Sequence, residues 1–351
     1  MTIRVTWRRA LVALLTLAAA GMLFAWSGIF NVAASSGHWA ITDWFLHWTM
    51  RNSVRTHTLL EGVESPRDPS GLISAAGHFE QSCAVCHGAP GQKASPVTRS
   101  ATPPAPDLTE TVPTWTDAQL FWILKHGVKY TGMPAWPTLE RKDEVRRMVG
   151  FIRLLPEMSV TEYRALVAHD GQGGLPTVPE ARGLVACVGC HGADGRGRGQ
   201  GDIPILGGQR ADYLEASLVR YANLRRESGV MAAAAAPLDP DERRWLASYF
   251  AAMPGLGGGA RPTSGAAAEI ALRGRPSDQL PACVSCHDAG GRRPFPVIHG
   301  QRASYIAQRL RQWRGEETVV DARKPQDVMP VIARRIPEEM IDPLARWFAG
   351  E

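Results

Sequence analysis

The chain has 351 residues, enough for about two or three domains, which excludes a protein with one small hydrophobic core. Hydrophobic residues make up 44% of the chain and charged residues 21%, a balance that excludes an intrinsically disordered chain and a membrane protein with many spans. The formal net charge is +5 without a dense basic run, so nothing in the composition supports binding to nucleic acid.

An apolar segment without charged residues occupies residues 10–30. As a helix it would extend about 31 Å, roughly one hydrocarbon thickness. Arg4, Arg8 and Arg9 precede it, which predicts a cytoplasmic N-terminus and a translocated remainder. We therefore expect a single-pass anchor in the inner membrane, with the rest of the chain in the periplasm. A cleaved signal peptide is the alternative, because the small residues 32–34 resemble a cleavage site.

A second helix is expected directly after this segment. Ile41, Trp44, Phe45 and Trp48 recur at the spacing of one helical face. Such an aromatic stripe is typical of a helix that lies among the lipid headgroups, although a helix packed on a partner's membrane domain would show the same pattern. Residues 1–60 are therefore predicted to form a membrane anchor and an interfacial helix.

Three segments of similar size follow, separated by linkers rich in proline and glycine, and we predict one domain from each: residues 72–156, 178–253 and 266–351. Each segment holds one Cys-x-x-Cys-His motif, and no cysteine lies outside the motifs. The motif residues are Cys83, Cys86 and His87 in the first segment, Cys187, Cys190 and His191 in the second, and Cys283, Cys286 and His287 in the third.

The spacing within the motif suits the attachment of haem. Two thiols three positions apart lie on one side of a helical turn, where both can add to the vinyl groups of one haem, and the next histidine then faces the iron. The sequence thus predicts three covalently bound haem c groups. A thiol-disulfide motif would need a βαβ context and no histidine, and a structural zinc site would need two cysteine pairs to converge.

Each segment also offers a methionine for the opposite side of the iron. Met133, Met231 and Met329 follow the histidines of their motifs by 46, 40 and 42 residues, and each comes shortly before a predicted terminal helix. We expect them on loops that cross the open face of each haem. His126 in the first segment and His299 in the third are rival ligands, although the role of a satisfied polar histidine suits His126 better.

The second and third segments contain an internal repeat. Residues 204–214 match residues 296–306 at an offset of 92, whereas the cysteine pairs are offset by 96. The proline that begins each copy is expected to place its carbonyl against the motif histidine of the same segment. Arg210 and Arg302 would then either pair with haem propionates or be ordinary arginines at a helix start.

The motifs resemble those of class I cytochromes c. In the first segment, Ser-Cys-Ala-Val-Cys-His-Gly and Thr-Gly-Met-Pro-Ala-Trp are similar to the single-haem domain of membrane-anchored cytochromes, and the other two segments resemble the tandem two-haem cytochromes of the bacterial periplasm. The resemblance implies an all-α fold in which a transmembrane helix precedes three small helical domains. It also implies one-electron transfer, with the ligand pairs His87/Met133, His191/Met231 and His287/Met329.

The predicted function is therefore a membrane-tethered periplasmic cytochrome of a respiratory chain, without a reaction of its own. It would pass electrons between a donor, such as a membrane dehydrogenase or a quinol-oxidising complex, and an acceptor such as a terminal oxidase. The alternative is a haem enzyme of the peroxidase or nitrite reductase type. Such an enzyme needs an exchangeable iron position, which the three methionine candidates argue against.

Overall fold

The computed structural model describes residues 6–62, 67–167, 175–176, 178–257, 260–288, 290, 294–315 and 328–351. The secondary structure in these ranges is helical, with two isolated β-bridges and no strand. This confirms the all-α fold class predicted from the sequence.

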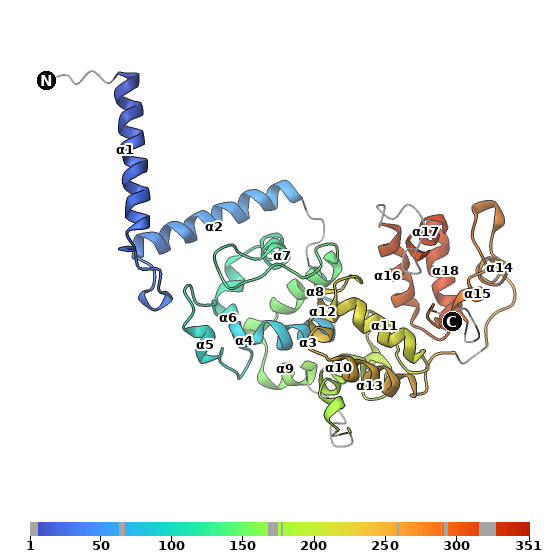
Figure 1. Cartoon of the computed structure of the whole chain (residues 1–351). Helices are drawn as coiled ribbons and strands as arrows, with labels where there is room; N and C mark the ends of the chain where they lie inside the picture. The colour runs from blue at the N-terminus through green and yellow to red at the C-terminus, as the bar shows by residue number, and fades with distance from the viewer. Residues whose placement is uncertain are drawn as a thin grey trace.

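Two helices form the N-terminal region. Helix α1 (Trp7–Trp26) extends away from the rest of the chain with none of its residues buried, and α2 (Ala40–Glu61) runs beside the next helical unit (Figure 1). By its length and a mean hydropathy of 1.8, α1 qualifies as a membrane-spanning helix, a test that an N-terminal signal sequence also passes. The short 3-10 helix η1 (Ala34–Ser36) lies between them.

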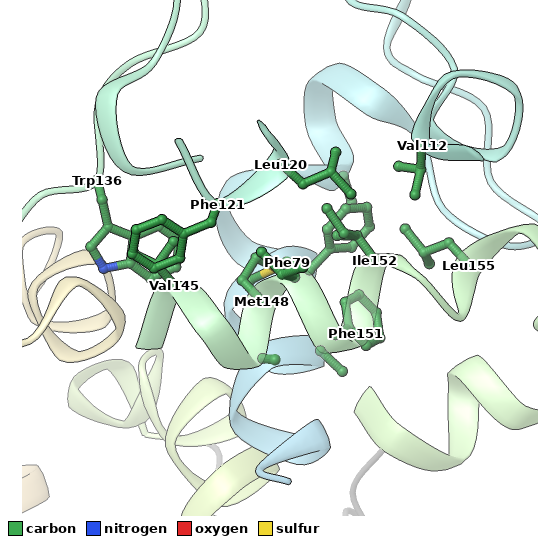
Figure 2. Close-up of a cluster of buried hydrophobic side chains, with 14 of the residues drawn as sticks. Phe79, Val112, Leu120, Phe121, Trp136, Val145, Met148, Phe151, Ile152 and Leu155 are labelled. Atoms are coloured by element: carbon green, nitrogen blue, oxygen red, sulfur yellow. The ribbon is translucent and has the colours of Figure 1, made fainter. Parts of the chain in front are cut away.

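The first unit surrounds one hydrophobic core. Helix α3 crosses α8, and the fully buried side chains of Phe79, Phe121, Met148 and Phe151 fill the space between the helices (Figure 2). Its helices are α3 (Leu72–Ser82), α4 (Ala84–His87), α5 (Pro96–Arg99), α6 (Leu108–Thr111), η2 (Val112–Thr114), α7 (Asp117–His126), α8 (Lys142–Ile152), η3 (Leu155–Glu157) and α9 (Val160–Val167).

The second and third units repeat one order of helices, each around its own core. In both, the motif helix is followed by a long helix, a short helix and a terminal helix that packs on the long one. The second unit has η5 (Pro179–Ala181), α10 (Leu184–His191), η6 (Gly197–Gly199), α11 (Ala211–Ala222), α12 (Gly229–Ala235) and α13 (Pro240–Ala251). The third has α14 (Ala266–Arg273), η7 (Pro276–Asp278), α15 (Val284–His287), α16 (Ala303–Arg314), α17 (Val328–Arg335) and α18 (Glu338–Ala349).

The second and third units are joined by a reciprocal set of hydrogen bonds. The amide group of Gln209 donates to the carbonyl of Val297 at 2.9 Å and accepts from its N–H at 3.0 Å. Gln301 makes the same pair of bonds with Ile205, at 3.0 and 2.9 Å. Both glutamines are buried, and both come from the repeated Gly-Gln-Arg sequence. The repeat therefore joins the two units to each other.

The first unit packs on the second through α3 and α8. Asp202 of the second unit accepts a hydrogen bond of 2.6 Å from the Ser74 hydroxyl and lies 3.6 Å from the Arg147 guanidinium. Asp143, also on α8, accepts a bond of 2.9 Å from Gln308 of the third unit. Helix α8 thus contacts both of the other units.

Candidate haem sites

The three motifs adopt the helical turn that the sequence predicted. In each one the histidine ends the helix, and its Nδ1 hydrogen-bonds to the carbonyl of a proline further along the chain. The pairs are His87 with Pro106 at 2.9 Å, His191 with Pro204 at 3.3 Å, and His287 with Pro296 at 2.9 Å.

These bonds prepare the imidazoles to bind a metal. A carbonyl at Nδ1 fixes the tautomer and the ring orientation, and it leaves Nε2 available to coordinate a metal. Burial lowers the pKa of His191 to about 4 and lowers that of His287 as well, so both rings are neutral near pH 7. The expected roles of Pro204 and Pro296 are confirmed. Pro106 was missed, because nothing in the sequence distinguishes it from the other prolines of its loop.

The cysteines suit thioether bonds better than thiolate chemistry. Burial raises the pKa of Cys83 and Cys187 to about 12, and that of Cys190 and Cys283 to about 11. Thiols that exchange disulfides or bind zinc have a lowered pKa instead. Within the described ranges, no group of three His, Cys, Asp or Glu side chains is placed to hold a metal ion. The raised pKa of these four thiols therefore does not favour a redox disulfide.

One largely apolar cavity contains the candidate residues of the second and third sites. The residues of both motifs line it, together with Met231, Met329 and the prolines that bond the histidines. The cavity has a volume of about 2410 Å³, including its open mouth. The first set, namely Cys83, Cys86, His87 and Met133, is not part of its lining. The second and third sites are therefore neighbours in one cavity.

The three methionines are half-buried but lie on different kinds of segment. Met133 lies on the expected loop, where its carbonyl accepts from the Val128 N–H at 3.2 Å. Met231 and Met329 lie instead in the first turns of the short helices α12 and α17. The difference at Met231 has a local cause, because the Ser228 hydroxyl accepts its N–H at 3.1 Å and so begins the helix.

Two arginines that the sequence analysis did not select lie in this cavity. Arg226 donates to the Tyr213 and Ser217 hydroxyls at 3.1 and 2.8 Å, and Arg309 lies 4.6 Å from the centre of the Trp313 ring. Neither forms an ion pair with a carboxylate in the described ranges. Two cations without a carboxylate partner in a largely apolar cavity suit a ligand that brings its own carboxylates, as a porphyrin with propionates does.

The two arginines named from the repeat make other contacts. Arg210 donates to the carbonyls of Phe295 and Asp288 in the third unit, and Arg302 donates to the carbonyl of Arg196 in the second. Both guanidinium groups thus reach across the interface between these units.

Comparison with known proteins defines the family. Residues 73–152 match the family model described as cytochrome C oxidase, cbb3-type, subunit III. The thiosulfate dehydrogenase electron acceptor of Thiomonas intermedia is 33% identical over 211 residues, which cover 58% of this chain and 94% of that protein. The chain belongs to the cytochrome c family.

Other relatives are cytochromes of the c4 type. Cytochrome c4 of Thiocapsa roseopersicina is 32% identical over 188 residues, which cover 51% of this cytochrome and 94% of the relative. The solved structure of Acidithiobacillus ferrooxidans cytochrome c4 is 31% identical, covers 47% of this chain and 98% of its own, and superposes with a TM-score of 0.39. As a c-type cytochrome, the protein binds haem c covalently and takes part in electron transfer.

Proposed function

We propose that this cytochrome carries three haem c groups and relays single electrons on the periplasmic side of the inner membrane. Each Cys-x-x-Cys-His motif would hold one haem, with the axial pairs His87/Met133, His191/Met231 and His287/Met329. The observation that carries the proposal is the same contact in all three motifs, a histidine whose Nδ1 is bonded to a proline carbonyl.

Bound haem supplies reversible one-electron chemistry at its iron. The chain's own residues prepare the site for that chemistry. The proline carbonyls orient the imidazoles, the largely apolar cavity surrounds the second and third sites, and a thioether sulfur at the iron would raise the reduction potential. No proton needs to move and no substrate bond needs to break, so the sites require no general acid or base.

The N-terminal helices support a membrane location. Helix α1 is long and apolar enough to span, and Trp44, Phe45 and Trp48 of α2 are each more than half exposed. Exposed aromatic side chains next to a spanning helix are typical of the headgroup level of a bilayer. We therefore assign residues 1–60 to the anchor and the interfacial helix.

The relatives support partners on both sides of the relay. The Thiomonas intermedia relative is named as the electron acceptor of a thiosulfate dehydrogenase, and the first unit matches a model of an oxidase subunit. We propose a dehydrogenase as the donor, with thiosulfate oxidation as the first candidate reaction, and a terminal oxidase as the acceptor. A quinol-oxidising complex is the competing donor.

Haem quantification of the purified full-length chain tests the proposal. We expect three haems per chain from the pyridine haemochrome spectrum and from intact mass, and two in the double variant Cys83→Ala/Cys86→Ala. The ferric protein should show the red absorption band of methionine ligation, and Met133→Ala should weaken it by about a third. Fewer than three haems in the wild type, or no such band, would refute the three-site relay.

The donor is tested by reduction kinetics. Thiosulfate together with a thiosulfate dehydrogenase should reduce the ferric cytochrome, and neither should do so alone. Reduction by a quinol-oxidising complex with quinol, but not by the dehydrogenase, would assign the competing donor.

A further inference from the structure

Glu144 is a buried carboxylate at the contact between the first and second units. It lies on α8 and is 6% exposed. Its Oε2 accepts from the Trp136 indole N–H at 3.2 Å and from the Gly229 backbone N–H at 2.8 Å. Its Oε1 accepts from the Ser228 hydroxyl at 2.5 Å and lies 2.9 Å from an Arg141 nitrogen. Each carboxylate oxygen therefore bridges one group of the first unit and one of the second.

On the side of the first unit, Glu144 holds the end of the loop that carries Met133. Trp136 comes three residues after Met133, and its backbone N–H donates to the Lys125 carbonyl at 3.0 Å. Trp136 is 6% exposed and lies at the margin of the first core (Figure 2). The indole also lies directly on the second unit, because a Cβ at Gly229 would be 2.3 Å from its nitrogen.

On the side of the second unit, Glu144 holds the start of the helix that carries Met231. The Ser228 hydroxyl that donates to Glu144 also accepts the Met231 N–H at 3.1 Å. Val230, between them, packs on the hydrophobic core of the first unit. The Ser228 hydroxyl thus links the backbone of Met231 to the carboxylate that holds the Met133 loop.

We propose that Glu144 is a positioning residue that couples axial ligation at the first and second haem sites. It acts through Trp136 on the Met133 loop and through Ser228 on the Met231 helix. The inference rests on the proposed function, because both methionines must be ligands. The third site provides an internal reference, since Met329 lies on α17 of another unit.

Substitution by glutamine isolates the role of the carboxylate. Glutamine keeps the size of glutamate but offers one acceptor oxygen instead of two. One of the two bridges must therefore lose its acceptor, whichever way the amide turns. Buried donors left without an acceptor are costly, and hydrogen bonds to a charged group are stronger than those between neutral groups.

The test is competition for the iron in the ferric holoprotein. Imidazole displaces weakly held methionine, and the methyl resonances of the axial methionines in the NMR spectrum report each site once assigned with Met133→Ala, Met231→Ala and Met329→Ala. In Glu144→Gln we expect imidazole to bind about tenfold more tightly at both the first and the second site, the lower end of the range for a bond to a charged group. The third site should be unchanged.

Two further variants separate coupling from general loosening. Glu242 is a similarly buried glutamate that caps α13 of the second unit, and Glu242→Gln should leave the first site unchanged. Ser228→Ala keeps the carboxylate but removes one bridge, so it should weaken methionine binding at both sites, and it decides the question if Glu144→Gln does not fold.

An effect of Glu144→Gln or Ser228→Ala confined to one site, or absent, would overturn the inference. A wild-type spectrum without axial methionine signals would instead refute the proposed ligand pairs.

Discussion

The imidazole of His78 is buried where the first and second units meet. It is 5% exposed, its ring centre lies 4.7 Å from that of Trp136, and its Nδ1 has no hydrogen-bond partner in the described ranges. Burial lowers the pKa of His78 to about 4, and Glu144 opposes only part of that shift. The ring is therefore neutral in the folded protein near pH 7.

This burial makes stability depend on pH. Between pH 6.5 and about 4 the unfolded chain binds a proton at His78 that the folded protein does not, so stability falls as the pH falls. We expect His78→Phe to remove up to about 3 kcal/mol of this loss, measured by denaturant unfolding of the holoprotein at pH 7 and pH 4.5. The exposed His57 is the control position, and an equal effect of His57→Phe would contradict the assignment.

Helix α8 contains a glycine, Gly150, where it makes close contact with the backbone of Asp68, just before the first unit. A Cβ at Gly150 would lie 2.1 Å from the carbonyl oxygen of Asp68, and the Asp68 N–H donates back to the Arg146 carbonyl at 3.0 Å. The neighbour is backbone, so it cannot rotate away as a side chain would. The entering segment is thus fixed along the helix that also carries Glu144.

Two opposing effects decide the outcome of Gly150→Ala. Helix propensity favours alanine by about 1 kcal/mol, whereas overpacking a buried contact costs about 1–3 kcal/mol. Because the contact is so short, we expect the cost to prevail and the melting temperature to fall by about 5 °C or more. Gly21→Ala is the control, since Gly21 is also helical but no atom of the described protein lies within 4 Å of its added Cβ. A melting temperature that rises in Gly150→Ala would refute this explanation.

The sequence was most informative where chemistry and chain spacing coincide. The helical turns of the motifs, and the carbonyls of Pro204 and Pro296, follow from local spacing and from the repeat. It was least informative about contacts between units. Glu144 lies in a run of charged residues that is typical of an exposed helix start, and its partners Ser228 and Gly229 lie more than 80 positions away. No local pattern reveals such a pair.

The reciprocal glutamine bonds connect the second and third units around the shared cavity. Each glutamine bonds to the backbone N–H and carbonyl of one residue in the opposite unit. These residues, Ile205 and Val297, directly follow the prolines that bond the motif histidines. The contact that joins the units is therefore adjacent in sequence to the contact that orients each imidazole.

The two pairs of glutamine hydrogen bonds are equivalent, so in each single variant the intact pair serves as the control for the broken one. In Gln209→Ala the Val297 amide loses its acceptor, so its hydrogen exchange should accelerate by about tenfold, while the Ile205 amide keeps its protection. Gln301→Ala should give the opposite pattern, and the double variant should expose both amides. Mass spectrometry of exchanged peptides measures this. Equal loss of protection at both amides in each single variant would show that the two bonds do not act separately.

Helix α2 is attached to the first unit, and in the proposed membrane setting this attachment would limit the movement of the molecule about its anchor. Glu61 bonds to Lys125 and to His126, and the His57 ring stacks 5.7 Å from that of Trp122. In the proposed membrane setting, the first unit would stay close to the bilayer, with the third unit at the opposite end of the chain (Figure 1). The first haem site would then lie in the unit that is attached to the anchor, so a partner embedded in the lipid beside that anchor would exchange electrons with this site first.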